Sequence, residues 1–203
     1  MGGMMKKRRM STGRRRIMGW ALAGLVGIGS VVWAREPLET RKLDAAREPA
    51  TAARIEWQRD CLDRSYQRRN NFAWALAQVE GLGKKEYIAH SGIDTREDMS
   101  AESRKKIQNV ISQAVPRKDQ IFDVLCVNGN DVVDGPNCWY RHVDTEFKIL
   151  EDLASRLPDQ TVTGRVRLYT DLPPCASCRG VIRQFLDRYP NIQMQVLYRG
   201  SKP

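Results

Sequence analysis

The stretch Arg165-Val166-Arg167-Leu168-Tyr169-Thr170-Asp171-Leu172-Pro173-Pro174-Cys175-Ala176-Ser177-Cys178 decides the fold that we expect for this chain. Val166, Leu168 and Thr170 occupy every second position between charged or aromatic residues, and this alternation predicts a strand. Two prolines break the strand, and apolar residues then recur at helical spacing from Val181 to Tyr189. Cys175 and Cys178 are therefore expected where a strand turns into a helix.

A second helix is expected to begin at Asp144-Thr145-Glu146. The apolar residues that follow share one helical face, and they are Phe147, Leu150, Ala154 and Leu157. Asp144 and Glu146 would then occupy the first turn of that helix. If the two helix starts meet at one edge of a sheet, the two cysteines and the two carboxylates converge. A right-handed strand, helix, strand unit from Val166 to Val196 makes its two strands parallel.

These residue types suit a catalytic zinc site. Two thiolates and a carboxylate can hold Zn²⁺ and leave a fourth position for water, whereas a structural zinc site is closed. A helix N-terminus carries partial positive charge, so we expect Cys175 and Cys178 to have lowered pKa values and to bind as thiolates. Zinc lowers the pKa of bound water toward neutrality, and Glu146 could carry protons between that water and a substrate. Glu146→Ala is expected to keep zinc and lose activity.

The motifs Asp144-Thr145-Glu146-Phe147-Lys148-Ile149-Leu150 and Pro174-Cys175-Ala176-Ser177-Cys178 resemble those of the bacterial polymorphic-toxin deaminases, within the cytidine deaminase-like superfamily. The similarity runs from Asn71 to about Val196. It implies an α/β fold, a three-layer α/β/α sandwich with a mixed sheet. It also implies that Asp144, Cys175 and Cys178 bind zinc and that Glu146 is catalytic. The implied reaction is hydrolytic deamination of a nucleobase, foremost cytosine in single-stranded or unpaired nucleic acid, by a secreted toxin that an immunity protein restrains.

Asp144 departs from the superfamily pattern, which has a histidine two residues before the glutamate. A carboxylate oxygen is an acceptable zinc ligand, so the site is retained. His142-Val143-Asp144 offers a second register, in which His142 binds the metal and Asp144 is the base. We favour Asp144 as ligand and Glu146 as base, because the Phe-Lys-Ile-Leu run that follows fixes the register of the resemblance. His142, and His90-Ser91 at the end of a predicted strand, are then expected on the substrate side; a surface turn is the other interpretation of His90-Ser91.

Two other functions fit parts of the sequence. A Cys-x-x-Cys pair at a strand-to-helix turn is also typical of thiol-disulfide oxidoreductases. No tryptophan precedes Cys175, however, and 25 residues follow Cys178, too few for the rest of a thioredoxin-like domain. A catalytically silent, membrane-tethered binding module would bind zinc and tolerate Glu146→Gln. Zinc content and the redox activity of the cysteine pair separate these alternatives from a deaminase.

The beginning of the chain carries a second signal. Residues 1–34 hold seven basic and no acidic residues, and they end in an uncharged run from Ile17 to Ala34. This order predicts an export signal or N-terminal membrane anchor that contacts the membrane or the export machinery, in a protein secreted or anchored at the cell envelope. Residues 35–50 are expected to form a linker, and residues 51–203 the deaminase-like domain. Residues 35–203 hold 27 basic and 24 acidic residues, so the whole-chain charge of +10 does not indicate a duplex-binding face.

Further patterns concern secondary structure. Thr51 to Val79 predicts one long helix or two in succession, and Asp98 to Ala114 predicts another. The apolar run from Ile121 to Val127 predicts a strand. The chain stops soon after Tyr198, so the final helix and strand of larger deaminases are expected to be missing, which would leave one side of the pocket open to a polymer.

Two pairs of residues before the helix at Asp144 have more than one interpretation. Trp139-Tyr140 could stack on an unpaired base, or could pack as a hydrophobic staple or core contact. Cys126 and Cys138 could form a disulfide in an oxidising compartment. Such a compartment would also threaten zinc-binding thiolates, which indicates action after delivery into a reducing cytoplasm.

Overall fold

The computed structural model describes residues 38–200 of the 203-residue chain. The elements in this range are β1 (Glu39–Lys42), α1 (Pro49–Asp60), α2 (Arg64–Gln67), β2 (Phe72–Val79), β3 (Glu86–His90), η1 (Arg96–Asp98), α3 (Ala101–Ile107), η2 (Arg117–Asp119), β4 (Cys126–Val127), β5 (Trp139–Tyr140), α4 (Thr145–Ala154), β6 (Gly164–Thr170), α5 (Ala176–Arg188) and β7 (Ile192–Tyr198). The export signal or anchor expected in residues 1–34 lies outside this range. Among the described helices, none combines the length and apolar character needed to cross a membrane.

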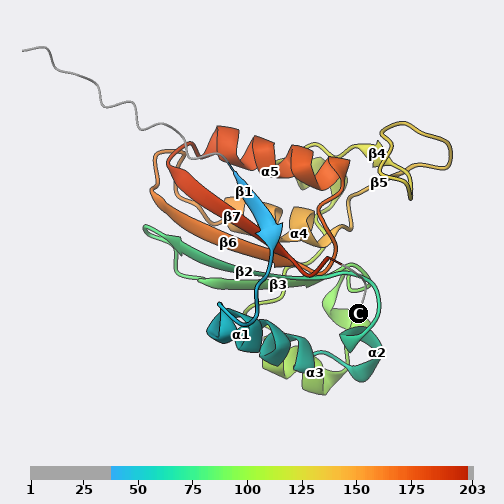
Figure 1. Ribbon diagram of the computed structural model, residues 1–203, viewed down its shortest axis with the longest axis vertical. Coiled ribbons are helices and arrows are strands. Elements are labelled where there is room, and N and C mark those ends of the chain that lie inside the picture. The colour runs from blue at the N-terminus through green and yellow to red at the C-terminus, as the bar shows by residue number, and fades with distance from the viewer. Residues whose placement is uncertain (1–37, 201–203) are drawn as a thin grey trace, which may run out of the picture. The chain divides into compact units, whose positions relative to one another are not determined.

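Five strands form one mixed sheet, as Figure 1 shows. Their order is β1-β7-β6-β2-β3, with β1, β7 and β6 parallel to one another. β2 runs antiparallel to both β6 and β3. The predicted parallel pairing of the strands that flank α5 is therefore confirmed. β4 and β5 form a separate two-stranded ribbon beside one end of α5.

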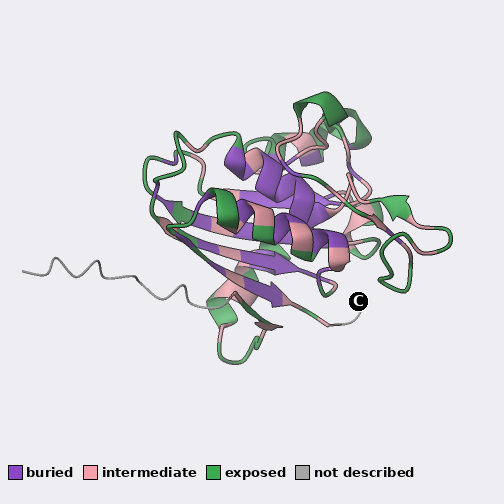
Figure 2. Cartoon of the chain, turned by 90° about the horizontal axis from the view of Figure 1, so that it is seen from above, coloured by how far each residue is buried: buried purple, intermediate pink, exposed green. Residues whose placement is uncertain are grey.

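Helices cover both faces of this sheet. α4 and α5 lie on one face, and α1, α2 and α3 lie on the other (Figure 1). Each interface has its own apolar core, one built with α4 and α5 and the other with α1 and α3. The sheet and its two helical layers make the α/β/α sandwich that the sequence predicts. The central strands are mostly buried, as Figure 2 shows.

Strand β2 corrects the expectation of helical structure from Thr51 to Val79. Its alternate residues Ala73, Ala75 and Ala77 join the core under α4 and α5, while Phe72 and Trp74 face the opposite core. A strand buried on both faces loses the polar positions that give a surface strand its alternation, so its sequence can pass for a helix. The helical prediction holds only for α1 and the short α2.

Strand β1 corrects the expectation of a linker at residues 35–50. Glu39 to Lys42 pair in parallel with Gln195 to Tyr198, and the Leu43 amide donates to the Tyr198 carbonyl over 2.9 Å. β1 therefore forms the edge of the sheet beside β7. The β1 residues are polar and mostly exposed, so their sequence gives no apolar signal.

Two more segments are less regular than expected. Helix α3 covers only Ala101–Ile107 of the predicted helix from Asp98 to Ala114, and Ile111 then forms a parallel bridge with Ile88 at the edge of β3. Only Cys126–Val127 of the apolar run from Ile121 pairs as a strand. The amides of Ile121 and Phe122 instead donate to the Glu151 carboxylate at 2.8–3.0 Å. In this part of the chain, hydrogen bonds from the backbone amides to the Glu151 side chain take the place of hydrogen bonds to a neighbouring strand.

Candidate active site

The two helix starts meet, and they bring together the three predicted metal ligands. Cys175 Sγ and Cys178 Sγ lie 3.4 and 3.2 Å from Asp144 Oδ2, and 3.3 Å from each other. Cys178 is buried, whereas Asp144 and Cys175 are partly exposed. Two sulfurs and one carboxylate oxygen this close can bind one metal ion. The donor set fits Zn²⁺, which accepts both thiolate and carboxylate ligands.

Local backbone structure explains why the Asp144 carboxylate faces the cysteines. Asp144 is the N-cap residue of α4, a position where aspartate often accepts a bond from the helix backbone. Its side chain makes no such capping bond here, so Oδ2 stays directed at the two sulfurs. Cys175 is the N-cap of α5, and its sulfur accepts from the Cys178 amide at 3.4 Å. Both helices thus present ligands from their first turns, as predicted.

The pKa values of the Cys175 and Cys178 thiols are shifted in opposite directions. The hydrogen bond between the sulfurs lowers the pKa of Cys175 and raises that of Cys178, which burial raises further. The expectation that both cysteines have a lowered pKa is therefore confirmed for Cys175 and wrong for Cys178. Without a cation nearby, thiolates at Cys175 and Cys178 would repel one another and the Asp144 carboxylate.

Glu146, two residues after Asp144, is buried in the first turn of α4. Its side chain is 2% exposed, and its Oε2 accepts from Thr145 Oγ1 at 2.9 Å. Burial, reinforced by the charge of Asp144, raises the pKa of Glu146 above its usual 4.5. A carboxyl group with a raised pKa holds its proton more readily, which suits a group that both accepts and returns one.

Asn71 belongs to the same site, although sequence reasoning did not assign it a role there. Its Nδ2 donates to Thr145 Oγ1 at 2.7 Å and to Thr170 Oγ1 at 2.9 Å, and its Oδ1 accepts from the Leu172 amide at 3.1 Å. One amide group therefore joins the start of β2, the start of α4 and the end of β6. The motifs alone could not reveal this role, because Asn71 lies more than seventy residues from either motif.

His90 and Ser91 take up structural roles near Asn71. The His90 ring is fully buried, with Nε2 at 2.9 Å from the Arg69 carbonyl and Nδ1 accepting from the Gly92 amide at 3.1 Å. Ser91 Oγ accepts from the Asn71 amide at 3.0 Å. Both ring nitrogens of His90 are therefore engaged by backbone, so its predicted contact with substrate gains no support from the geometry.

His142 lies just before Asp144 but is not gathered with the three ligands. Its ring stacks on Tyr140 with centroids 5.8 Å apart and meets Phe147 edge-on at 6.2 Å. Its Nδ1 is buried and has no hydrogen-bond partner within the described part of the chain. The group of potential ligands includes Asp144 and omits His142, which favours the register with Asp144 as ligand.

The β4–β5 ribbon is fastened to the start of α5. A disulfide joins Cys126 to Cys138 and closes the loop between the strands. Asp131 in this loop accepts from the Ala176 amide at 2.5 Å and from Arg179 at 2.9 Å. The loop therefore supplies a carboxylate acceptor to the backbone amide of Ala176, the residue next to Cys175. The disulfide considered from the sequence is present, and Cys61, Cys175 and Cys178 remain free thiols.

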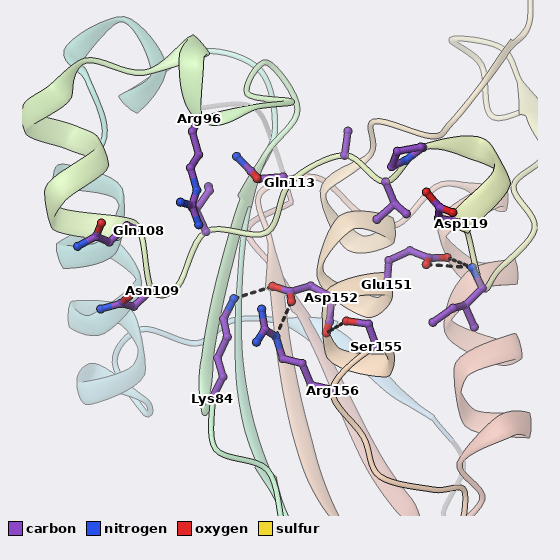
Figure 3. A pocket seen from close by; sticks show the side chains of 15 residues that line it. Lys84, Arg96, Gln108, Asn109, Gln113, Asp119, Glu151, Asp152, Ser155 and Arg156 are labelled. Carbon is purple, nitrogen blue, oxygen red and sulfur yellow. Dashed lines mark hydrogen bonds and ion pairs between the residues drawn. The ribbon is translucent and has the colours of Figure 1, made fainter.

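A separate cavity of about 490 Å³ lies at the other end of α4 (Figure 3). The Asp152 carboxylate in its wall bonds Lys84 and Arg156, each at 2.6 Å, and Ser112 at 2.8 Å. Glu151 is engaged by the amides of Ile121 and Phe122. None of the predicted site residues lines this cavity. Lys84 and Arg156 in its wall both pair with Asp152, and we assign no ligand to the cavity.

The comparison with known protein families agrees with the arrangement of the candidate site. The sequence model of the toxin-deaminase family, described as the BURPS668_1122 family of deaminases, matches residues 58–200. The chain belongs to this family. The match covers most of the chain and includes Asn71 and both motifs of the candidate site. The comparisons with curated proteins and with solved structures gave no match. As a member of the toxin-deaminase family, the protein is an enzyme of the deaminase class with the α/β fold of the cytidine deaminase-like superfamily.

Proposed function

We propose that this toxin-deaminase family member is a zinc-dependent hydrolytic deaminase of a nucleobase, with cytosine in single-stranded nucleic acid as its substrate. One observation carries the proposal: two sulfurs and one carboxylate oxygen lie within 3.4 Å of each other beside the buried Glu146. Zinc held there would lower the pKa of a water molecule and so supply a nucleophile at neutral pH.

The chain's own residues have distinct roles in this reaction. Asp144, Cys175 and Cys178 would hold the cation, which would supply an activated water. Glu146 takes a proton from water, passes it to the ring nitrogen of cytosine, and returns the second proton to the leaving amine. The new C–O bond forms at C4, the C–N bond breaks, and ammonia leaves. Thr145 keeps the Glu146 carboxylate oriented through its 2.9 Å hydrogen bond.

A secreted, toxin-like role completes the proposal. Family membership supports it, as does the basic and then apolar order of residues 1–34, which is typical of an export signal or anchor. We propose that the protein acts on nucleic acid of a recipient cell and that the producing cell restrains it with an immunity protein.

The test compares Glu146→Gln with Glu151→Gln. Both glutamates belong to α4 and both are 2% exposed, but Glu151 contacts the backbone of residues 121 and 122 and not the cysteines. We expect one zinc per chain in the wild type and in both variants. Glu146→Gln should lose at least about a hundredfold in rate, the lower range for a general acid–base. Absence of zinc from the wild type, or an active Glu146→Gln enzyme, would contradict the mechanism.

The substrate is tested inside a bacterium that lacks uracil repair. Expression of the wild type should produce an excess of C-to-T changes in sequenced DNA, or in copies of RNA, and Glu146→Gln should not. An excess of A-to-G changes would instead assign adenine. No excess of either kind, with an active zinc enzyme in vitro, would direct the proposal toward a free nucleotide.

A thiol-disulfide oxidoreductase is the second candidate, because the sulfurs of Cys175 and Cys178 lie 3.3 Å apart. The position of the Asp144 carboxylate argues against an oxidoreductase. A negative group 3.2–3.4 Å from both sulfurs opposes the attacking thiolate that such an enzyme needs, but favours a bound cation. The oxidoreductase predicts a redox-active pair and no zinc, so the zinc determination separates the two functions.

A further inference from the structure

The segment that leads into α4 displays aromatic rings on the surface. The side chains of Trp139 and Tyr140 are 48% and 56% exposed. In the described part of the chain, five of the six exposed large apolar residues lie between residues 125 and 140, and Trp57 is the sixth. The two rings are therefore neither core contacts nor a hydrophobic staple, the alternative roles that the sequence allowed for them. Exposed apolar residues gathered in one segment mark a candidate binding surface.

An arginine lies over each of the two rings. The Arg141 guanidinium carbon lies 3.8 Å from the centroid of Trp139, and that of Arg117 lies 5.5 Å from the centroid of Tyr140. Arg141 is itself fixed, because it donates to the carbonyls of Val127 and Asn128 at 3.2 and 3.1 Å. A surface arranged before binding loses less conformational entropy when a ligand arrives.

The exposed rings are continuous with the candidate active site. Tyr140 stacks on His142 at an angle of 27°, and His142 meets Phe147, the neighbour of Glu146 in α4. Arg141 Nη1 lies 3.9 Å from Oδ1 of Asp144. A ligand on Trp139 or Tyr140 would therefore lie next to a molecule that reacts at Glu146.

The chemistry of this surface fits an unpaired nucleobase. Flat bases stack on aromatic side chains without regard to sequence, and guanidinium groups supply positive charge for the adjoining phosphates. The exposed Arg117 lies near the Tyr140 ring, and the exposed Lys118 follows it in the chain. A hydrophobic protein partner would cover the rings, but it would not use the cations that accompany them.

We infer that Trp139 and Tyr140, which as consecutive residues of β5 point to opposite sides of the ribbon, each form a stacking platform for a base that flanks the deaminated base in a single-stranded nucleic acid. The inference rests on the proposed function, because it places the reacting base at Glu146. It adds a subsite outside the metal centre. It also assigns the β4–β5 ribbon, whose disulfide lies directly before Trp139, to substrate recognition.

The experiment measures binding and deamination separately with the full chain. Binding is followed by fluorescence anisotropy of a labelled single-stranded oligonucleotide with one cytosine, using Glu146→Gln so that the substrate is not consumed. Deamination of the same oligonucleotide is followed with Glu146 intact. In two further oligonucleotides, the base on the 5′ or the 3′ side of the cytosine is replaced by an abasic site. Trp139→Ala and Tyr140→Ala are compared with Trp57→Ala, which removes another exposed ring, one that lies 4.2 Å from the Arg54 guanidinium on α1.

We expect Trp139→Ala or Tyr140→Ala to weaken binding of the intact oligonucleotide by about 5- to 150-fold, the range for one stacked base. With both rings intact, one of the two abasic oligonucleotides should bind more weakly than the intact oligonucleotide by the same factor. On that abasic oligonucleotide, the ring variant should bind as well as the protein with both rings. Trp139→Phe or Tyr140→Phe should restore most of the binding. Trp57→Ala should bind and react normally.

Several outcomes would overturn the platform. If Trp139→Ala weakens the intact and both abasic oligonucleotides equally, the rings act on structure and not on a base. If both ring variants bind normally, or the chain binds no oligonucleotide, the rings serve another ligand such as a partner protein. Ring-dependent binding without any deamination would instead support the platform and count against the proposed reaction, so the two failures are distinguishable.

Discussion

Asn71 joins three parts of the site through one side-chain amide, and its loss should be felt in both stability and activity. Asn71→Ala leaves the Leu172 amide without its acceptor and removes the donor to Thr145 and Thr170. We expect the free energy of unfolding to fall by about 1–3 kcal/mol, the range for a lost buried hydrogen bond. The rate should also fall, because Thr145 orients Glu146. Denaturant unfolding and kinetics check this, with exposed Asn109→Ala as the control.

Asp144 and His142 give opposite predictions for the metal. Asp144→Ala removes the oxygen that lies closest to both sulfurs, so zinc retained after dialysis should drop well below one per chain. Asp144→His should recover zinc binding, because imidazole nitrogen is also a zinc ligand. His142→Ala should keep zinc. Zinc retained by Asp144→Ala but lost by His142→Ala would establish the other register.

The two histidines make stability depend on pH in a defined direction. Burial lowers the pKa of both His90 and His142 below the usual 6.5, so each stays neutral in the folded chain where the unfolded chain takes up a proton. Their contribution is therefore fully present above pH 6.5 and is lost as the pH falls toward the folded pKa. Unfolding by urea at several pH values should show this slope, and His90→Gln should flatten it. An unchanged slope in that variant would exclude His90 as its source.

At the scale of the element, strand β1 can be tested through one amide. The Leu43 amide donates to Tyr198 at 2.9 Å, and proline at this position removes that donor. Leu43→Pro should lower the free energy of unfolding by roughly 1–3 kcal/mol more than Leu43→Ala, which loses the same side chain but keeps the amide. Equal losses in thermal or urea unfolding would show that the edge pairing contributes little.

The elements that sequence reasoning found are those whose residues alternate or recur against one apolar face. β6, α5, β7 and α4 are of this kind, and their order together with right-handed crossover predicts how the helix starts meet. β2 was misread because Phe72 to Val79 is buried on both sides. β1 was missed because its polar residues join the sheet through backbone bonds, which leave no trace in side-chain pattern.

The site was predictable to the extent that its chemistry lies in short motifs. Residue type and spacing single out Asp144, Glu146, Cys175 and Cys178 as candidates, and the structure brings Asp144 and the two cysteines together. Asn71 and the exposed state of Trp139 and Tyr140 depend on tertiary packing, which no local pattern encodes. For the same reason the sequence could not show that both ring nitrogens of His90 are engaged by backbone groups of Arg69 and Gly92.

At the scale of the whole molecule, one domain holds a disulfide and a second pair of cysteines in thiol form. Cys126 and Cys138 are bonded, while Cys175 and Cys178 keep their sulfurs 3.3 Å apart. In an oxidising compartment the second pair is one two-electron oxidation away from a bond of its own. The proposed zinc would then act as a protecting group, so that metal uptake must precede exposure to oxidant.

This order of events has a direct measure. After removal of zinc by a chelator and treatment with oxidised glutathione, the intact mass should fall by 2 Da as Cys175 and Cys178 join and two electrons pass to glutathione. Zinc should return only after a reductant is added. The zinc-loaded chain should resist the same treatment. The pairing of the four cysteines would thus require each molecule to bind zinc at Cys175 and Cys178 before it meets an oxidant.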